Sequence, residues 1–160
     1  MTAELIWKVY LSGEIHTNWR EEIEDAARHR GLSIRFSGPV TDHPASDDCG
    51  VAILGAEDNK FWHDRKGAQV NAIRTSTLIR DADVVVVRFG DKYKQWNAAF
   101  DAGYAAALGK PIIVNHDDSI IHPLKEVDAA ALAVAETPAQ IVDILDYVIT
   151  GKLADYTDQP

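Results

Sequence analysis

One acidic residue, Asp101, stands in a helix-forming stretch of small residues shortly after the most apolar segment of the chain. The valine run Val84–Val87 predicts a buried strand, residues 88–95 a polar loop, and Gln95–Leu108 a helix. Open parallel sheets bind ligands beyond the carboxyl ends of their strands, so Asp101 is expected beside a ligand. We expect it near the first turn of the helix, where unpaired amides and the helix dipole favour an ionised carboxylate. The alternative is an acid that complements the dipole and does no chemistry.

A second group of reactive side chains follows the first predicted strand, at residues 5–11. It offers a hydroxyl, a carboxylate and an imidazole within one loop: Ser12, Glu14 and His16. Gly13 lies among them and permits a close backbone approach or a positive φ. Because the carboxyl ends of parallel strands meet at one edge of a sheet, these residues are expected to lie at the same ligand site as Asp101. The alternative is that Ser12 and Glu14 only help to begin the next helix.

Two residues at the start of the Asp101 helix are further candidates for binding a ligand. Asn97 precedes Asp101 by four residues and therefore shares its face of the helix. Trp96 offers an aromatic face on which a nucleobase can stack. The alternative for Trp96 is a contact in the core or between subunits.

Several function classes lack their sequence signatures. No Gly-x-Gly-x-x-Gly follows the first strand and no Gly-Lys-Ser phosphate loop is present, so neither NAD nor ATP is expected and no cofactor is predicted. The Asp, His and Cys residues between positions 42 and 64 lack the regular spacing of metal ligands, which favours a hydrogen-bonded loop over a metal site. The net charge of −9 argues against a nucleic-acid polymer or an anionic membrane as a partner, but not against a neutral nucleoside.

Length and composition suit one domain over residues 1–160, with a polar tail at 152–160. A single cysteine, Cys49, excludes an intramolecular disulfide framework. The segment Met1–Trp7 does not resemble a signal peptide, and no apolar run approaches the roughly 20 residues that span a bilayer. We therefore expect a cytoplasmic protein.

Apolar periodicity and breaker residues predict alternating strands and helices. This order is typical of an α/β fold, a doubly wound flavodoxin-like or Rossmann-like sandwich with about five parallel strands. Residues 40–62 are expected to form a long irregular lid or interface element, and residues 116–128 a loop with one helical turn. Strands are expected at 5–11, 33–36, 83–89, 111–115 and 132–135, and helices at 18–30, 63–80, 95–108 and 138–149.

The helix that carries Asp101 also resembles a known family. The stretch Asn97-Ala-Ala-Phe-Asp-Ala-Gly-Tyr-Ala-Ala-Ala-Leu-Gly-Lys110, after Ala82-Asp-Val-Val-Val-Val87, is similar to nucleoside 2-deoxyribosyltransferases. In that family an acidic residue, followed by x-Gly-Tyr-Ala and a later Gly-Lys, marks the helix that bears the nucleophile. The first strand, Val9-Tyr-Leu-Ser-Gly13, is similar as well. The likeness extends from about Lys8 to Ile149 and is strongest to the YtoQ-type branch of the superfamily.

The resemblance implies a retaining transfer of a 2-deoxyribosyl group through a covalent sugar intermediate, or hydrolysis of the same N-glycosidic bond. Asp101 matches the nucleophile, Tyr10 the tyrosine whose hydroxyl holds that carboxylate, and Asp91 the acid that contacts the departing base. His122 is the candidate substitute for an Asn that the family commonly takes from a neighbouring subunit. The resemblance therefore also implies a small-molecule nucleoside or nucleotide as substrate, and a homo-oligomer with its site near a subunit interface.

Two departures from the family pattern keep a second function open. The family nucleophile is usually Glu, and Asp is one methylene shorter, which withdraws the carboxylate by roughly 1.5 Å. The loop before the helix, at residues 93–97, replaces an approach that usually contains glycine. The alternative is a non-catalytic nucleoside- or nucleotide-binding module on the same fold.

Overall fold

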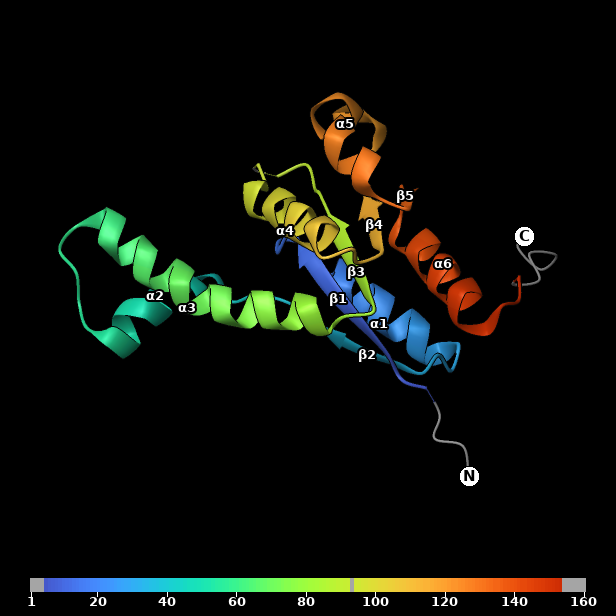
Figure 1. The fold of residues 1–160 in the computed structure, drawn as a ribbon, viewed down its shortest axis with the longest axis horizontal. Coiled ribbons are helices and arrows are strands. Elements are labelled where there is room, and N and C mark those ends of the chain that lie inside the picture. Colours follow the sequence, from blue (N-terminus) through green and yellow to red (C-terminus); the bar gives the residue numbers. More distant parts are fainter. Residues whose placement is uncertain (1–4, 93, 154–160) are drawn as a thin grey trace.

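Parallel strands form one five-stranded sheet in the order β2-β1-β3-β4-β5 (Figure 1). The computed structural model describes residues 5–92 and 94–153, so most of the predicted tail lies outside the described residues. The sheet confirms the predicted doubly wound α/β class, and each strand lies within two residues of its predicted limits. The strands are β1 (Trp7–Gly13), β2 (Ile34–Ser37), β3 (Val84–Arg88), β4 (Ile112–Asn115) and β5 (Ala133–Ala135).

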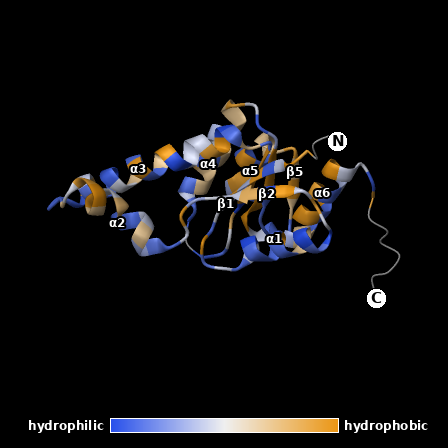
Figure 2. Cartoon of the chain, turned by 90° about the horizontal axis from the view of Figure 1, so that it is seen from below, coloured by the Kyte–Doolittle hydropathy of each residue, from blue (hydrophilic) through white to orange (hydrophobic). Residues whose placement is uncertain are grey.

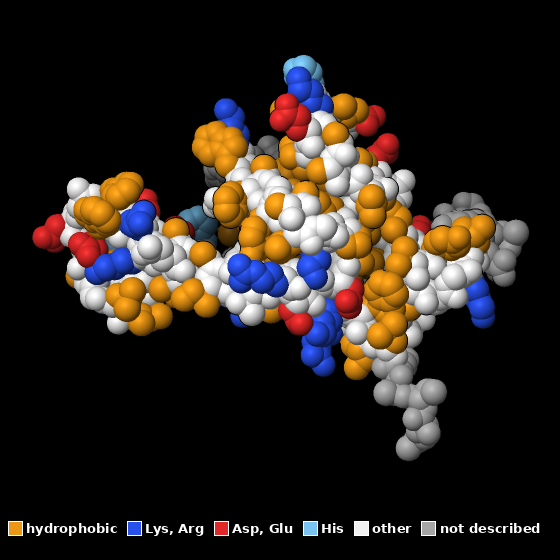
Figure 3. Space-filling model, in the orientation of Figure 1, with side chains coloured by type: hydrophobic (Ala, Val, Ile, Leu, Met, Phe, Trp, Pro, Cys, Tyr) orange, Lys and Arg blue, Asp and Glu red, His pale blue; other side chains and the backbone are white. Residues whose placement is uncertain are grey.

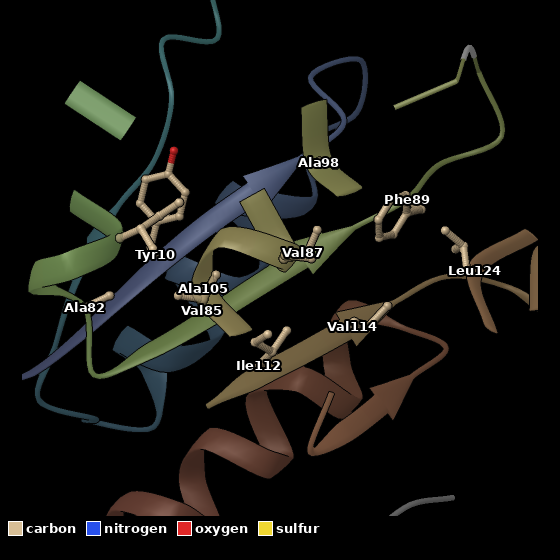
Figure 4. Packing of buried hydrophobic residues seen from close by; sticks show 12 residues of the cluster. Tyr10, Ala82, Val85, Val87, Phe89, Ala98, Ala105, Ile112, Val114 and Leu124 are labelled. Atoms are coloured by element: carbon tan, nitrogen blue, oxygen red, sulfur yellow. The ribbon is translucent and has the colours of Figure 1, made fainter. Parts of the chain in front are cut away.

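The central strand β3 is buried on both faces, as its unbroken valine run predicts. Its four valines are at most 4% exposed, and their side chains alternate between two cores. Val85 and Val87 belong to one core, and Val84 and Val86 to the other. Figure 4 shows the first core, in which the small side chain of Ala105 lies over β3. The alanines of the Asp101 helix therefore let it approach the sheet closely.

Helices cover both faces of the sheet. On one face α1 and α6 lie side by side, and Arg30, just after α1, forms ion pairs with Asp143 and Asp146 of α6. On the other face lie α4 and the C-terminal part of α3. Figure 2 shows that α1 is polar on its outer side while the strands are hydrophobic. The helices are α1 (Trp19–His29), α2 (His43–Leu54), α3 (Lys60–Asp81), α4 (Trp96–Ala107), α5 (Ile121–Ala130) and α6 (Pro138–Thr150), with a 3₁₀ turn η1 (Asp118–Ile120) before α5.

Two helix ends follow directly from their residue types. Gly31 adopts a φ of 68° after α1, as expected of a glycine that ends a helix. The hydroxyl of Thr137 accepts a hydrogen bond from the Gln140 amide, and Pro138 stands in the first turn of α6. Both predicted boundaries are confirmed.

The prediction of an irregular connection at residues 40–62 is wrong. Helix α2 occupies most of it, and α3 begins at Lys60 rather than at His63. The prediction of a loop at residues 116–128 is also wrong over most of its length, because α5 begins at Ile121. Helix α2 buries only Gly50, so it has no apolar stripe by which a helix is normally detected.

Helix α2 and the N-terminal half of α3 form an arm that projects from the sheet (Figure 1). The two helices meet through facing glycines, since a Cβ on Gly50 would lie 2.3 Å from the amide nitrogen of Gly67. Several large apolar side chains remain on the surface of the arm, where hydrophobic atoms are visible in Figure 3. They are Ile53, Leu54, Phe61 and Trp62, each at least 51% exposed.

Replacing Gly50 by alanine is expected to separate α2 from α3 and to spare the sheet. The added methyl group would meet backbone atoms of Lys66 and Gly67, which cannot move aside as a flexible side chain can. Hydrogen exchange should show lost amide protection in α2 and unchanged protection in β1 and β3. Unchanged protection in α2 would contradict the glycine contact. A Gly103→Ala variant in α4, where an added Cβ meets nothing within 4 Å, controls for the gain in helix propensity alone.

Candidate active site

The topological switch point of the sheet lies between the ends of β1 and β3. The chain leaves β1 toward α1 on one face and leaves β3 toward α4 on the other (Figure 1). Doubly wound sheets bind their ligands at such a point. Ser12 lies near the end of β1, and Asp101 reaches it from α4, which covers the face of β1 that carries Ser12.

Gly13 brings the ends of β1 and β3 into direct contact. Its φ is 121°, and a Cβ at this position would lie 2.0 Å from the carbonyl oxygen of Arg88. The amide of Glu14 donates a hydrogen bond to that same oxygen at 3.1 Å. The close backbone approach predicted for Gly13 is therefore confirmed, and it leaves no room for a side chain.

The Asp101 carboxylate is held by the hydroxyl of Ser12. Ser12 Oγ donates to Asp101 Oδ2 at 2.6 Å, and Ser12 itself is only 1% exposed. Desolvation raises the pKa of the half-buried Asp101, while the hydrogen bond from Ser12 opposes that rise because it stabilises the ionised form. Asp101 is the sixth residue of α4, so its expected position near the first turn is wrong and the helix dipole is not its main influence.

The Tyr10 hydroxyl does not hold the Asp101 carboxylate, in contrast to the role that the resemblance implies. Tyr10 is fully buried, and within the described residues its hydroxyl forms no hydrogen bond of normal geometry. Burial, and after it the negative charge of Asp101, raise the pKa of Tyr10 to about 12. Figure 4 shows the hydroxyl directed away from β1. Ser12, two residues further along the same face of β1, holds the carboxylate in its place.

The carboxylate of Glu14 is engaged by its own loop and by Arg88 at the end of β3. It accepts hydrogen bonds from the His16 amide at 2.6 Å, the Thr17 amide at 3.0 Å and the Thr17 hydroxyl, and from Arg88 Nε at 3.2 Å. Burial opposes ionisation, but the hydrogen bonds from Thr17, His16 and Arg88 outweigh it and lower the pKa of Glu14. Glu14 therefore shapes the loop that begins α1, which was the alternative interpretation of this residue.

Polar residues at the strand ends extend this network across the sheet, and they were not predicted from the sequence. Arg88 at the end of β3 donates to the side chain of Asn115 at the end of β4, and Asn115 donates to the Ala135 carbonyl at 2.8 Å. On the other side, Arg20 of α1 donates to the carbonyls of Leu11, Gly13 and Glu14 at 2.7–3.1 Å. A usable signal was present, because Arg88 and Asn115 each close a run of buried apolar residues.

His116 forms a buried contact with Asp128 beside this network. Its Nδ1 lies 2.7 Å from the Asp117 carbonyl, and its Nε2 lies 3.0 Å from both carboxylate oxygens of Asp128. Both ring nitrogens therefore lie within hydrogen-bonding distance of oxygen atoms. The pair joins the end of β4 to α5 and was not predicted.

The remaining predicted site residues are exposed around the carboxyl edge of the sheet. Asp91 lies in the loop after β3, Asn97 in the first turn of α4, and His16 in the loop after β1. Trp96 is 74% exposed, with Lys94 Nζ 5.7 Å from its ring centre. His122 lies on the surface of α5. Their roles in binding or catalysis stay predictions.

The part of the chain that the structure describes carries neither a metal cluster nor a membrane span. Within residues 5–92 and 94–153, no group of three or more His, Cys, Asp or Glu side chains has a metal-binding arrangement. Within the same ranges, no helix combines the length and the apolar character that crossing a membrane requires.

Replacing Ser12 by alanine is expected to shift the pH dependence of any reaction that uses ionised Asp101. The lost hydrogen bond stabilised the charged form, so its removal raises the pKa of Asp101 further. The acid limb of kcat/KM should therefore move to higher pH, as measured from pH–rate profiles. A Ser76→Ala variant in α3 serves as a control, and an unmoved acid limb in the Ser12 variant would contradict the assignment.

The doubly wound sheet and the half-buried carboxylate at its switch point define an α/β protein with a candidate site at the carboxyl edge of its sheet. Residues 10–149 match the family described as nucleoside 2-deoxyribosyltransferase YtoQ, and the chain belongs to this family. The YtoQ protein of Bacillus subtilis (strain 168) is 46% identical over 140 residues, which cover 88% of this chain and 95% of that protein.

Solved structures resemble this chain at low sequence identity. A 2-deoxyribosyltransferase from Bacillus psychrosaccharolyticus is 16% identical, with a TM-score of 0.49 over 85% of this chain and 90% of that chain. A de novo designed Rossmann 2x3 protein is 13% identical, with a TM-score of 0.50 over 98% of this chain and 100% of that chain. Because a designed protein shares the architecture, the fold alone does not assign an activity.

Proposed function

We propose that this protein acts on the N-glycosidic bond of a nucleoside or nucleotide, with Asp101 as the nucleophile. The observation that carries the proposal is the hydrogen bond from the buried Ser12 to a half-buried Asp101 at the switch point of the sheet. Membership of the YtoQ family supports a deoxyribosyltransferase-like activity. A carboxylate that is positioned by a buried hydroxyl is suited to attack an electrophilic carbon.

The proposed reaction proceeds in two displacements at C1′ of the sugar. A carboxylate oxygen of Asp101 forms a bond to C1′ as the C1′–N bond breaks, and the base leaves with that electron pair and takes up a proton. A nitrogen of a second base, or a water oxygen, then attacks C1′ from the freed face, loses its proton, and releases the carboxylate. Two inversions give net retention, as in retaining glycosidases. Asp91 is the proposed residue that contacts the departing base.

The proposal is tested by incubating the purified protein with a deoxynucleoside and a second free base, followed by chromatography. A new deoxynucleoside supports transfer, and free base without a new deoxynucleoside supports hydrolysis. Binding without either product would favour the alternative, a nucleoside- or nucleotide-binding module. The raised pKa of Asp101 favours that alternative, because burial disfavours the ionised carboxylate that the attack needs.

We also propose a homo-oligomer in which a second copy of the chain borders the site. Trp96 and Phe100 of α4 are 74% and 75% exposed and lie close to Asp101 along the helix, and the arm carries further exposed apolar side chains. Light scattering tests this assembly, and a monomer at all concentrations would contradict it. A cytoplasmic location is proposed as well, in keeping with the single cysteine.

A further inference from the structure

Strand β1 continues beyond the end of its neighbour β2. The two strands pair only as far as Tyr10, although β1 runs on to Gly13. Carbonyl groups alternate in direction along a strand, and that of Lys8 points to the β3 side, where it accepts a hydrogen bond from the Asp83 amide. The carbonyl of Leu11 therefore faces the side on which β2 has already ended. A carbonyl in such a place needs a partner from outside the sheet.

Arg20 of α1 supplies the hydrogen bonds that a longer β2 would have made. Its Nε donates to the Leu11 carbonyl at 3.1 Å, its Nη2 to the Gly13 carbonyl at 3.1 Å, and its Nη1 to the Glu14 carbonyl at 2.7 Å. These carbonyls lie on both sides of Ser12 in the sequence. Because a guanidinium presents its N–H donors in a rigid plane, Arg20 fixes the oxygens that it binds relative to one another.

Trp19 holds the Arg20 guanidinium in place. The guanidinium carbon lies 4.6 Å from the centre of the buried Trp19 ring, and the indole Nε1 donates to the same Glu14 carbonyl at 2.9 Å. Burial lowers the pKa of Arg20, and the negative charge of Glu14 opposes this effect. Two adjacent side chains of α1 therefore fix the backbone at the end of β1.

Ser12 connects these contacts to the proposed nucleophile. Helix α1 packs on one face of the sheet, whereas the Ser12 hydroxyl donates to Asp101 on the other face, at 2.6 Å. The shift in the pKa of Asp101 has two causes, burial and the hydrogen bond from Ser12, and the charge of Arg20 is not one of them. An influence of Arg20 on Asp101 must therefore pass through the backbone of Ser12.

We propose that Arg20 is a positioning residue, which directs the Ser12 hydroxyl at Asp101 by holding the backbone carbonyls on both sides of Ser12. The catalytic meaning of this inference rests on the proposed function. The shape of arginine matters here more than its charge, because the single ammonium of a lysine cannot reproduce a planar set of donors. Arg20→Lys should therefore displace Ser12 although it keeps the positive charge.

Titration of the Asp101 carboxyl carbon by NMR tests the inference without any turnover. Ser12→Ala removes a hydrogen bond to the ionised carboxylate and should move the titration midpoint to higher pH. Arg20→Lys should move it in the same direction, but should add nothing when Ser12 is already alanine. Arg28→Lys, on the same helix in an exposed ion pair with Asp25, is the matched control and should leave the midpoint unchanged.

Kinetics of the same variants connect the inference to the proposed reaction. Arg20→Lys should lower kcat/KM for a deoxynucleoside by at least about 10-fold, since a small misplacement of a reacting group is costly. In the Ser12→Ala background, the same substitution should change kcat/KM by less than about 2-fold. A general loss of stability would lower activity in both backgrounds alike.

Three results would overturn the inference. The first is an Asp101 midpoint that does not move in Arg20→Lys. The second is an equal shift with and without the Ser12 hydroxyl, because Arg20 would then act by another route. The third is loss of folding in both Arg20→Lys and Arg20→Gln, which would give Arg20 a structural role only.

The proposed function can fail separately from this inference. If the midpoints move as expected but the wild-type protein forms no product from deoxynucleosides, Arg20 still positions Ser12 against Asp101, and the N-glycosidic chemistry is wrong. If the wild-type protein forms product but the midpoints do not move, the chemistry stands and the role of Arg20 is wrong.

Discussion

Replacement of Asp101 by asparagine is expected to reduce turnover of deoxynucleosides by at least about 10³-fold while the protein remains folded. Asparagine keeps the size of the side chain and accepts the hydrogen bond that Ser12 donates at 2.6 Å to Asp101. It cannot form the covalent bond to C1′ that the proposed mechanism needs. The chromatographic assay, run with wild type and variant at equal concentration, measures the loss directly.

The Asp101→Asn variant is expected to lose turnover but to keep or gain thermal stability. Burial raises the pKa of Asp101, so the folded protein disfavours its ionised form at neutral pH. The neutral amide removes that cost, and the variant should melt at the same or a higher temperature than wild type. As the pH falls through the folded pKa, wild-type Asp101 becomes protonated and the difference should close. Lost activity with retained or increased stability is typical of a residue kept for function.

Two outcomes would contradict the assignment of Asp101. Undiminished product formation by the variant would show that another group is the nucleophile. A large fall in melting temperature near pH 7 would show that the ionised carboxylate has a structural role. Asp118→Asn, at an exposed position in η1, serves as the control for removal of one negative charge.

The sheet could be predicted from the sequence because its strands are short apolar runs between strong breakers. Strand β3 begins with an unbroken run of valines, and this run predicts burial on both faces of the strand. Gly31 and Thr137 also mark helix ends, because glycine readily adopts a positive φ and the threonine hydroxyl accepts a hydrogen bond from a helix amide. Helix α2 could not be predicted in this way. Its packing depends on Gly50 meeting Gly67, a contact that contributes no apolar periodicity to the sequence.

The candidate site was predictable in its location but not in its contacts. Because β1 and β3 are parallel neighbours, their carboxyl ends lie at the same edge of the sheet. Ser12 near the end of β1 and Asp101 in the helix that follows β3 were therefore expected at the same site. Which hydroxyl reaches Asp101 depends on side-chain distances across the strand and helix, and there Ser12 takes the place expected of Tyr10. The engagement of Glu14 with Arg88 also depends on tertiary structure, since they stand 74 residues apart in sequence.

Replacement of Gly13 by alanine is expected to destabilise the protein by at least about 3 kcal/mol, because steric clash and backbone strain add at this position. The new Cβ would lie 2.0 Å from the carbonyl oxygen of Arg88, a backbone atom that also accepts the hydrogen bond from the Glu14 amide. Relief of the clash would have to part β1 from β3 at the switch point and so move Ser12 away from Asp101. Urea denaturation measures the loss, and a variant that folds should also show reduced turnover.

Two further glycine variants separate steric clash from backbone strain. Gly31 has a φ of 68°, and no atom lies within 4 Å of the position that a Cβ would take, so Gly31→Ala should cost only about 1 kcal/mol, from strain alone. Gly103 lies exposed within α4 with the same open surroundings, so Gly103→Ala should stabilise the protein by up to about 1 kcal/mol. If Gly13→Ala costs no more than Gly31→Ala, the ends of β1 and β3 are not in the tight contact that positions Ser12. The proposal that Ser12 positions Asp101 as the nucleophile would then be contradicted.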